Sequence, residues 1–325
     1  MMGAQWSQFF PGKPTFTEAN LAPQDGKVYL ITGGSSGIGY EMVKILYAKN
    51  ARVYIAGHSE DKARKAIQDL RASVLSTRGS IEFLHLELDN LASIKSSVEQ
   101  FRAKESKLHV LWNNAGISQP PLGSVSKQGI ELQLATNCLG PFLFTQLLLP
   151  LLQAAASESQ TPGSVRVVWT TSQVIELSAP EGGIVMSELS DPPDDKTRNY
   201  INSKTGNLFL STELARRVGP SQGIVSVAQN PGAASTNLFR HTPWITYLAW
   251  PLLHDPKFAA YTQLYAGLSK DIGVGNNGCY VVPWGRITTG LREDLVVATK
   301  LEGDGGSGRA KEFWEFCEEK IRDYA

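Results

Sequence analysis

A tyrosine and a lysine one helical turn apart are the residues of this sequence best suited to chemistry. Tyr200 and Lys204 stand in the run YINSK, and Ser172 closes the earlier apolar run VRVVWTTS. Residues four apart on a helix share a face, so the two side chains point the same way. A free tyrosine ionises at about pH 10, and a neighbouring ammonium group would lower that pKa. We therefore predict that Tyr200 exchanges a proton with a substrate oxygen that Ser172 holds by a hydrogen bond.

A glycine-rich segment is the second chemical signal. The run KVYLITG leads into TGGSSGIG at 32–39, and a helical pattern follows. Gly33 permits a tight turn, Gly37 lets the backbone approach a pyrophosphate, and Gly39 allows close packing of helix on strand. The helix N-terminus adds amide donors and a positive dipole end. An isolated glycine pattern could equally be a turn without a ligand, but its place after the first strand of a repeated array predicts dinucleotide binding.

The end of the second predicted strand bears on which dinucleotide binds. It reads YIAGHSEDK, with Gly57 where an NAD site usually has an acidic residue, His58 next, and Lys62 and Arg64 just beyond. Without a carboxylate, nothing there repels the 2′-phosphate of NADP. We predict that NADP(H) is preferred and that NAD(H) is possible. A solvated surface role for His58 and the two cations remains an equal alternative.

The elements that must position these residues alternate along the chain. Seven strand-like runs extend from KVYLITG to CYVVPWG, and the first six of them are separated by segments with helical apolar spacing. This order requires crossover connections, and it predicts an α/β fold: a doubly wound parallel sheet (Rossmann fold) of about seven strands with helices on both faces. We predict one Rossmann-type domain over 1–325, with a leader at 1–26, a substrate-pocket insertion at 236–278 and a C-terminal segment at 286–325.

The insertion between the sixth and seventh strands is rich in aromatic residues. Trp244 and Tyr247 lie in the run PWITYLAWPLL, which has no cluster of basic residues. We predict a pocket for a small lipophilic substrate lined by Ser172, Val174, Tyr200, Trp244 and Tyr247. The aromatic residues could equally form the core of the insertion or an oligomer contact.

Composition excludes several other functions. Lys plus Arg and Asp plus Glu both number 31, so no electrostatic footprint for nucleic acid is expected. The five histidines have no metal-ligand spacing, and no metal site is predicted. The apolar stretches at 142–152 and 244–253 are shorter than the roughly 20 residues of a membrane span, so no transmembrane segment is expected. Three cysteines without C-x-x-C spacing favour a reducing compartment, and we predict a cytoplasmic protein, with peripheral membrane contact possible.

By its motifs the sequence resembles the short-chain dehydrogenases/reductases. TGGSSGIG resembles the family's T-G-x-x-x-G-x-G fingerprint, NNAG at 113–116 its N-N-A-G, YINSK its Y-x-x-x-K and NPGAAST its P-G-x-x-x-T segment. The matches occur in family order over about residues 27–325, so chance is improbable. Looser likenesses, including SKTGNLFLSTELARR, resemble the retinol dehydrogenase and WW-domain oxidoreductase branch, and the C-terminal run resembles its fungal members.

The resemblance implies a catalytic set of Asn137, Ser172, Tyr200 and Lys204. In the family the lysine also binds the nicotinamide ribose, and the asparagine positions a water molecule in a proton relay. Together, the motifs and the second strand end predict a cofactor site formed by Gly33, Ser35, Ser36, Gly37, Ile38, Gly39, His58, Lys62, Asp89, Asn114, Ala115, Gly116, Tyr200, Lys204, Pro231, Gly232 and Thr236.

These patterns predict an NADP(H)-dependent oxidoreductase that interconverts a carbonyl and an alcohol on a lipophilic small molecule, with Tyr200 as general acid/base. Two alternatives remain open. The same scaffold can serve a redox-neutral dehydratase, epimerase or cyclase, or a dinucleotide-sensing interaction protein. The family often forms dimers, and we expect either a homodimer or, if the C-terminal segment covers the contact surface, a monomer.

Overall fold

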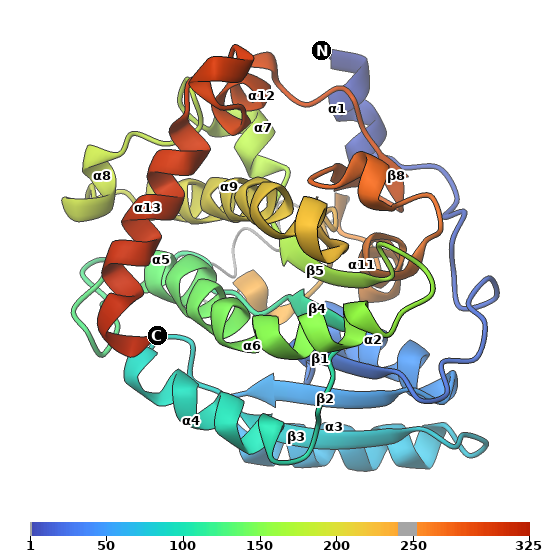
Figure 1. The fold of residues 1–325 in the computed structure, drawn as a ribbon. Coiled ribbons are helices and arrows are strands. Elements are labelled where there is room, and N and C mark those ends of the chain that lie inside the picture. The colour runs from blue at the N-terminus through green and yellow to red at the C-terminus, as the bar shows by residue number, and fades with distance from the viewer. Residues whose placement is uncertain (1, 240–251) are drawn as a thin grey trace.

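The computed structural model describes residues 2–239 and 252–325, and its centre is an eight-stranded sheet (Figure 1). The spatial order is β3-β2-β1-β4-β5-β6-β7-β8. The strands are β1 (Val28–Thr32), β2 (Arg52–Gly57), β3 (Ser80–His85), β4 (Val110–Asn113), β5 (Val165–Thr170), β6 (Ile224–Gln229), β7 (Tyr280–Val282) and β8 (Arg286–Ile287). Seven run parallel, which confirms the predicted parallel sheet, and the two-residue β8 adds an antiparallel edge next to β7.

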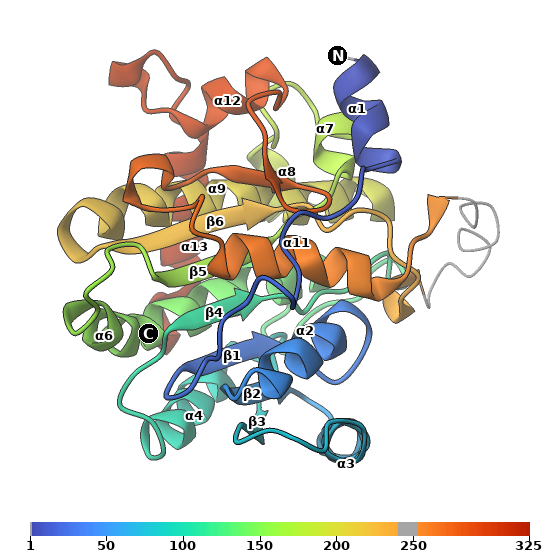
Figure 2. The same ribbon diagram turned by 90° about the vertical axis from the view of Figure 1, so that its right-hand side faces the viewer.

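Helices cover both faces of the sheet (Figure 2). One apolar cluster joins the sheet to α4 (Leu91–Arg102), α6 (Gly140–Ser157), α9 (Lys196–Gln222) and α13 (Arg309–Ile321). A second cluster, on the opposite face, joins it to α2 (Gly37–Ala48), α3 (Glu60–Ser73) and α11 (Pro256–Leu268). β1, β4, β5 and β6 are buried along their whole length. Their nearly continuous apolar sequences follow from this double covering.

The remaining helical segments are short and lie around this core. They are α1 (Met2–Phe9), α5 (Leu132–Leu134), the π-helix η1 (Ala135–Leu139), α7 (Val174–Ser178), α8 (Ser187–Ser190), η2 (Asn237–Phe239), η4 (Val274–Asn276), α12 (Glu293–Thr299), η5 (Glu302–Asp304) and η6 (Arg322–Tyr324). The chain leaves β1 toward β2 and β3 and then returns to place β4 on the other side of β1. Open α/β sheets bind ligands at the carboxyl ends of the strands beside such a reversal.

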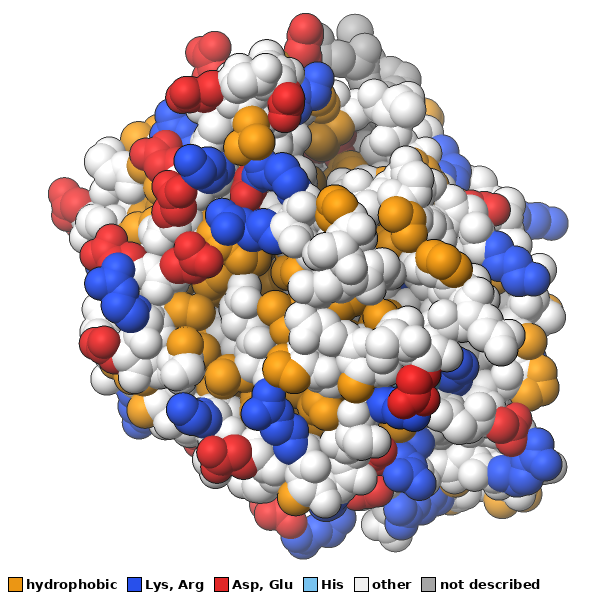
Figure 3. Space-filling model, viewed as in Figure 1, with side chains coloured by type: hydrophobic (Ala, Val, Ile, Leu, Met, Phe, Trp, Pro, Cys, Tyr) orange, Lys and Arg blue, Asp and Glu red, His pale blue; other side chains and the backbone are white. Residues whose placement is uncertain are grey.

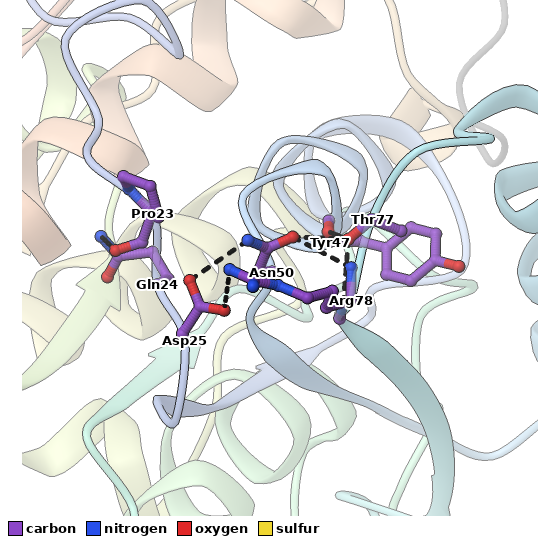
Figure 4. A network of polar contacts seen from close by, with 8 residues as sticks. Pro23, Gln24, Asp25, Tyr47, Asn50, Thr77 and Arg78 are labelled. Atoms are coloured by element: carbon purple, nitrogen blue, oxygen red, sulfur yellow. Dashed lines mark hydrogen bonds and ion pairs between the residues drawn. The ribbon is translucent and has the colours of Figure 1, made fainter.

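A polar network, which we call the amino-end network, ties the predicted leader to the opposite end of the sheet (Figure 4). It consists of Asp25, Asn50, Thr77 and Arg78, which precede β1, β2 and β3 in the chain. Asn50 has a φ of 69°, and its Nδ2 donates to Asp25 Oδ2 over 3.1 Å. Asn50 Oδ1 accepts from the Arg78 backbone N at 3.0 Å, and the Arg78 guanidinium forms an ion pair with Asp25 at 2.7 Å. The network holds three strand-entry turns together.

The C-terminal helix α13 covers α6 and α9. Phe313 packs against Phe209 of α9 with ring centroids 6.1 Å apart, and Trp314 packs against Phe142 of α6 at 4.6 Å. Gly206 makes this approach possible, because a Cβ there would lie 2.5 Å from Phe313 Cζ. The face formed by α6 and α9 is therefore covered in part by the same chain.

One helical stretch is longer and more apolar than the sequence pattern indicated. Leu132–Ser157 continues from α5 through η1 into α6, and by length and composition it could span a membrane. However, 67% of its apolar window is buried inside the fold, where it packs on the sheet as a core helix does.

Candidate active site

The glycine-rich loop follows β1 and leads into α2 at the carboxyl end of the sheet. Gly33 and Gly37 have φ values of 70° and 55°, a region that side-chain-bearing residues seldom adopt. A Cβ on Gly37 would lie 3.1 Å from Thr236 Cγ2, so the loop lies against the predicted P-G-x-x-x-T segment. Ser36 caps α2 without a side-chain hydrogen bond, and the first turn of α2 has no acidic residue. This helix N-terminus can therefore accept a phosphate group.

The NNAG segment after β4 is fastened to the same loop. The backbone N atoms of Asn114 and Ala115 donate to Thr32 Oγ1 at 3.0 and 2.9 Å, and Asn114 Nδ2 donates to the Thr32 carbonyl at 2.8 Å. A Cβ on Gly39 would lie 2.7 Å from Asn114 Nδ2, which explains why glycine stands there. The loop and the motif therefore form one rigid wall, and the residues present fit a dinucleotide.

Asn137 lies in the π-helix η1, a type of helix that is often found at functional sites. Its Oδ1 accepts from the Ile117 backbone N at 2.9 Å, and its Nδ2 donates to the Ile117 carbonyl at 3.0 Å and to Ser203 Oγ at 2.9 Å. A Cβ on Gly116 would lie 3.1 Å from Asn137 Oδ1 and 3.2 Å from Lys204 Nζ. Asn137, Gly116 and Lys204 therefore meet at one point.

Tyr200 and Lys204 lie on α9, next to the end of β5. The helix begins at Asp195, whose side chain accepts from the backbone N atoms of the first turn. Lys204 Nζ donates to the Thr170 carbonyl at 3.1 Å and lies 5.8 Å from the centroid of the Tyr200 ring. Tyr200 forms a side-chain hydrogen bond with Ser172. The structure thus brings together the four predicted catalytic side chains, from the segment after β5, from η1 and from α9.

Burial shifts the ionisation of the tyrosine–lysine pair. Tyr200 and Lys204 are 8% and 3% exposed. Burial raises the pKa of Tyr200 to about 12, although the hydrogen bond from Ser172 acts in the opposite direction. Burial also lowers the pKa of Lys204 to about 8, because the apolar surroundings penalise its ammonium form. The sequence led us to expect a lowered tyrosine pKa, but desolvation of the phenolate dominates and raises it.

The segment after β6 completes the rim of the site. Pro231 is buried, and Gly232 has a φ of 80° and donates its backbone N to Asn230 Oδ1 at 3.0 Å. Thr236 Oγ1 accepts from the Leu238 backbone N at 3.3 Å. The predicted substrate residues Trp244 and Tyr247 lie outside the described residues.

Comparisons with known proteins agree with this arrangement. Residues 27–243 match the family model described as short chain dehydrogenase. The chain belongs to the short-chain dehydrogenase/reductase family. It is 46% identical over 319 residues to the short-chain dehydrogenase/reductase iacJ of Pestalotiopsis fici, which covers 96% of each chain. It is therefore an oxidoreductase of the short-chain dehydrogenase/reductase type, similar to fungal members. The likeness to the retinol dehydrogenase branch stays a prediction.

Solved structures of this oxidoreductase family share the fold. A protein from Mycobacterium Paratuberculosis, described as putative and uncharacterized, is 26% identical with a TM-score of 0.69, covering 94% of this chain and 97% of that one. The NADPH-bound carbonyl reductase from chicken fatty liver has a TM-score of 0.61 at 22% identity, covering 82% and 99%. The 3-ketoacyl-(acyl-carrier-protein) reductase from Brucella melitensis, complexed with NADH, has a TM-score of 0.60 at 21% identity, covering 77% and 95%. At these identities, the last two likenesses show a shared fold.

The residues predicted to discriminate between cofactors lie at the end of β2 and the start of α3. His58 and Lys62 are exposed, and the Lys62 backbone N donates to Ser59 Oγ at 3.4 Å to begin α3. Arg64 forms an ion pair with Glu60 at 2.7 Å. A Cβ on Gly57 would meet nothing within 4 Å, so the space beside the strand end is open. The first turn of α3 carries two acidic residues, Glu60 and Asp61.

Two other predicted residues of the oxidoreductase occupy less exposed positions. Asp89 is half-buried, and its backbone carbonyl accepts from the Lys127 backbone N at 3.0 Å. Val174 begins α7 and is also half-buried, with its backbone N 3.3 Å from Ser172 Oγ. Val174 thus lies directly beside the residue that bonds Tyr200.

Sequence reasoning missed residues that reach the site from distant segments. Gln263 Nε2, from α11, donates to Asn114 Oδ1 at 2.6 Å, and the Gln263 backbone carbonyl accepts from Trp112 Nε1 at 3.0 Å. Gln8 of α1 bonds Glu176 and Asn230. Both glutamines belong to no motif, and only the tertiary fold reveals their partners.

Proposed function

We propose that this protein is an NADP(H)-dependent oxidoreductase that interconverts a carbonyl and an alcohol on a lipophilic small molecule, with Tyr200 as the general acid/base. The convergence of Asn137, Ser172, Tyr200 and Lys204 beside the glycine loop carries this proposal. A dinucleotide-sensing protein would have no use for such a set. The loop residues and the N-terminus of α2 would hold the pyrophosphate, and Lys204 would bind the nicotinamide ribose.

In the proposed reduction, a nicotinamide cofactor held by the glycine loop and Lys204 would supply a hydride for the carbonyl carbon. Tyr200 donates its phenolic proton to the carbonyl oxygen, and Ser172 holds that oxygen by a hydrogen bond. With a pKa of about 12, Tyr200 is protonated at neutral pH and ready to act as the acid. Lys204, with a pKa of about 8, is mostly protonated there and stabilises the phenolate that remains. Asn137 orders a water molecule that returns a proton through Lys204.

The NADP(H) preference is proposed from the sterically open space beside Gly57, where no carboxylate stands on the strand end itself, and from the exposed side chains of His58 and Lys62. Calorimetric titration with NADPH and NADH tests it on the wild-type protein and on Gly57→Asp. The wild type should bind NADPH more tightly. The new carboxylate should weaken NADPH binding by about tenfold or more, through repulsion of the 2′-phosphate, while NADH binding is kept or improved.

The matched control for this titration is Arg64→Ala, because Arg64 is already paired with Glu60 and should not contact the cofactor. Tighter binding of NADH by the wild type would reverse the cofactor assignment. Binding of neither cofactor would overturn the proposed function itself.

The substrate class is proposed from the apolar character of the predicted pocket, of which Val174 is the described apolar member. A panel of lipophilic aldehydes, ketones and alcohols should be turned over with net consumption or formation of NADPH. A redox-neutral enzyme would transform its substrate without a net change in NADPH, and this outcome would favour the second candidate function.

We also propose that the protein works in the cytoplasm without a nucleic-acid partner. Its formal net charge is zero, and acidic and basic side chains are mixed over the face seen in Figure 3.

Because α13 already covers part of α6 and α9, a monomer is favoured over a homodimer through these helices. Size-exclusion chromatography with light scattering would distinguish the two.

A further inference from the structure

A buried glutamine from the N-terminal helix links two loops of the site. Gln8 is 4% exposed, and its Nε2 donates to the two carboxylate oxygens of Glu176 at 3.1 and 3.2 Å. Its Oε1 accepts from Asn230 Nδ2 at 2.8 Å. We call these three residues the Gln8 bridge. It joins three parts of the chain that are far apart in sequence.

Each partner of Gln8 belongs to a segment that carries site residues. Glu176 lies on α7, which begins at Val174, two residues after Ser172. Asn230 lies between β6 and the Pro231–Gly232 pair, and its Oδ1 accepts from the Gly232 backbone N at 3.0 Å. The two ends of the Asn230 amide are thereby fixed, one by Gln8 and the other by the cofactor-site glycine.

Further contacts hold α1 in place over this rim (Figures 1 and 2). Arg286 Nη2 donates to the Ser7 carbonyl at 2.9 Å, and His254 Nε2 lies 3.0 Å from the Phe9 carbonyl. His254 in turn makes backbone hydrogen bonds with Ala233 and Ser235, in the segment after β6. The last carbonyls of α1 are thus capped by residues from the site's own surroundings.

We propose that Gln8 is a positioning residue for the oxidoreductase reaction: it fixes the Ser172–α7 loop relative to the Asn230–Gly232 loop. The N-terminal helix, which precedes the residues matched by the family model, then forms part of the frame of the active site. This inference rests on the proposed function, because its consequence is the placement of the substrate oxygen against Tyr200. Glu176 is 5% exposed, so loss of the donors from Gln8 leaves a buried carboxylate less well satisfied.

Exchanging the donor and acceptor groups tests the bridge. In Gln8→Glu, two buried carboxylates face one another, and both the bridge and the loop positions should be lost. In the double variant Gln8→Glu/Glu176→Gln, the new amide can donate to the new carboxylate, which also still accepts from Asn230. Trp6→Ala is the matched control, since Trp6 lies on the same helix and is 67% exposed.

The readouts are kcat and KM for NADPH-dependent reduction of decanal, together with amide hydrogen exchange in 172–178 and 229–236. Gln8→Glu should lower kcat by about tenfold or more, with a smaller change in the KM for decanal, and should speed exchange in both segments. The double variant should recover most of both properties, and Trp6→Ala should change neither. Recovery by the swap also separates loss of the bridge from failure to fold.

Unchanged exchange and kcat in Gln8→Glu, or a well-folded double variant without recovery, would overturn the bridge while leaving the oxidoreductase proposal standing. If amide hydrogen exchange in both segments speeds up in Gln8→Glu and recovers in the double variant, but the wild type reduces no carbonyl, the bridge is supported and the proposed function is overturned. The two failures are therefore distinguishable.

Discussion

Polar residues gather at both ends of the sheet, but in opposite surroundings. In the amino-end network, the Arg78 and Asp25 side chains are 79% and 46% exposed, so their ion pair is accessible to solvent. At the carboxyl end, Lys204 is 3% exposed and Asn137 1%. Water screens the first pair, so its contribution to stability is small. Within the described part of the chain, Lys204 Nζ donates to a backbone carbonyl and forms no ion pair with a carboxylate. Burial of its ammonium group is therefore not offset, and its pKa is lowered.

The difference shows which end the fold uses for chemistry. An exposed ion pair can hold turns together without altering the acidity of its members. A buried lysine and tyrosine destabilise the fold in their charged forms, and that destabilisation is expected where a site must move protons. We therefore expect substitutions at the carboxyl end to change activity strongly, and substitutions at the amino end to change neither activity nor stability by much.

The largest effect is expected from Tyr200→Phe, which removes the proposed proton donor and little volume. Turnover of a carbonyl with NADPH should fall roughly 10²–10⁴-fold, while NADPH affinity stays within a few-fold of wild type. Steady-state kinetics and calorimetry measure the two quantities. The control is Tyr47→Phe at the amino end, where Thr77 bonds the Tyr47 backbone carbonyl and not its hydroxyl. Turnover kept in Tyr200→Phe would remove Tyr200 from the mechanism.

Lys204→Met should separate function from stability. Activity should fall, but the free energy of unfolding at pH 7 should rise by roughly 1–3 kcal/mol, because a buried ammonium group is replaced by an apolar side chain of similar length. The Thr170 carbonyl keeps its hydrogen bond from Asn207 Nδ2 at 3.0 Å, so no buried acceptor is left alone.

The increase in the free energy of unfolding of Lys204→Met should depend on pH. The pKa of Lys204 is about 8 in the folded protein, against 10.5 for an ordinary, solvated lysine, so the unfolded chain binds more protons between these values. In the wild type, the buried ammonium group lowers the free energy of unfolding by its full amount below pH 8. This destabilisation becomes smaller as the pH rises to 10.5. Urea unfolding at about pH 7 and pH 10 measures this, with exposed Lys311→Met as control. An equal gain at both pH values would contradict the lowered pKa.

A smaller effect is expected from Ser172→Ala, which removes one hydrogen bond to the substrate oxygen and to Tyr200. Because the proton donor remains, kcat should fall by about tenfold to a hundredfold, less than in Tyr200→Phe. Kinetics of the two variants under the same conditions test the order. A larger loss in Ser172→Ala would assign the main chemical role to the serine.

The sequence predicted the sheet and the meeting of the catalytic side chains for identifiable physical reasons. Parallel strands covered on both faces need continuous apolar runs. Gly33 and Gly37 have positive φ values, and a Cβ on Gly39 would lie 2.6 Å from the Gly33 carbonyl oxygen. The amides of Gln8 and Gln263 gave no such signal, because a polar residue on a helix is usually solvated and their partners are more than a hundred residues away. The direction of the Tyr200 shift also depends on burial, which the spacing to Lys204 does not report.

The smallest effect is expected from Arg78→Ala at the amino-end network. The variant removes the guanidinium that pairs with Asp25, but the Arg78 backbone N still donates to Asn50 Oδ1, and Asn50 Nδ2 still donates to Asp25. The free energy of unfolding should therefore fall by less than about 1 kcal/mol, and turnover should not change. Urea unfolding and kinetics measure both. A loss of several kcal/mol, or a change in turnover, would mean that the two ends of the sheet are coupled, and that the difference in burial alone does not separate their roles.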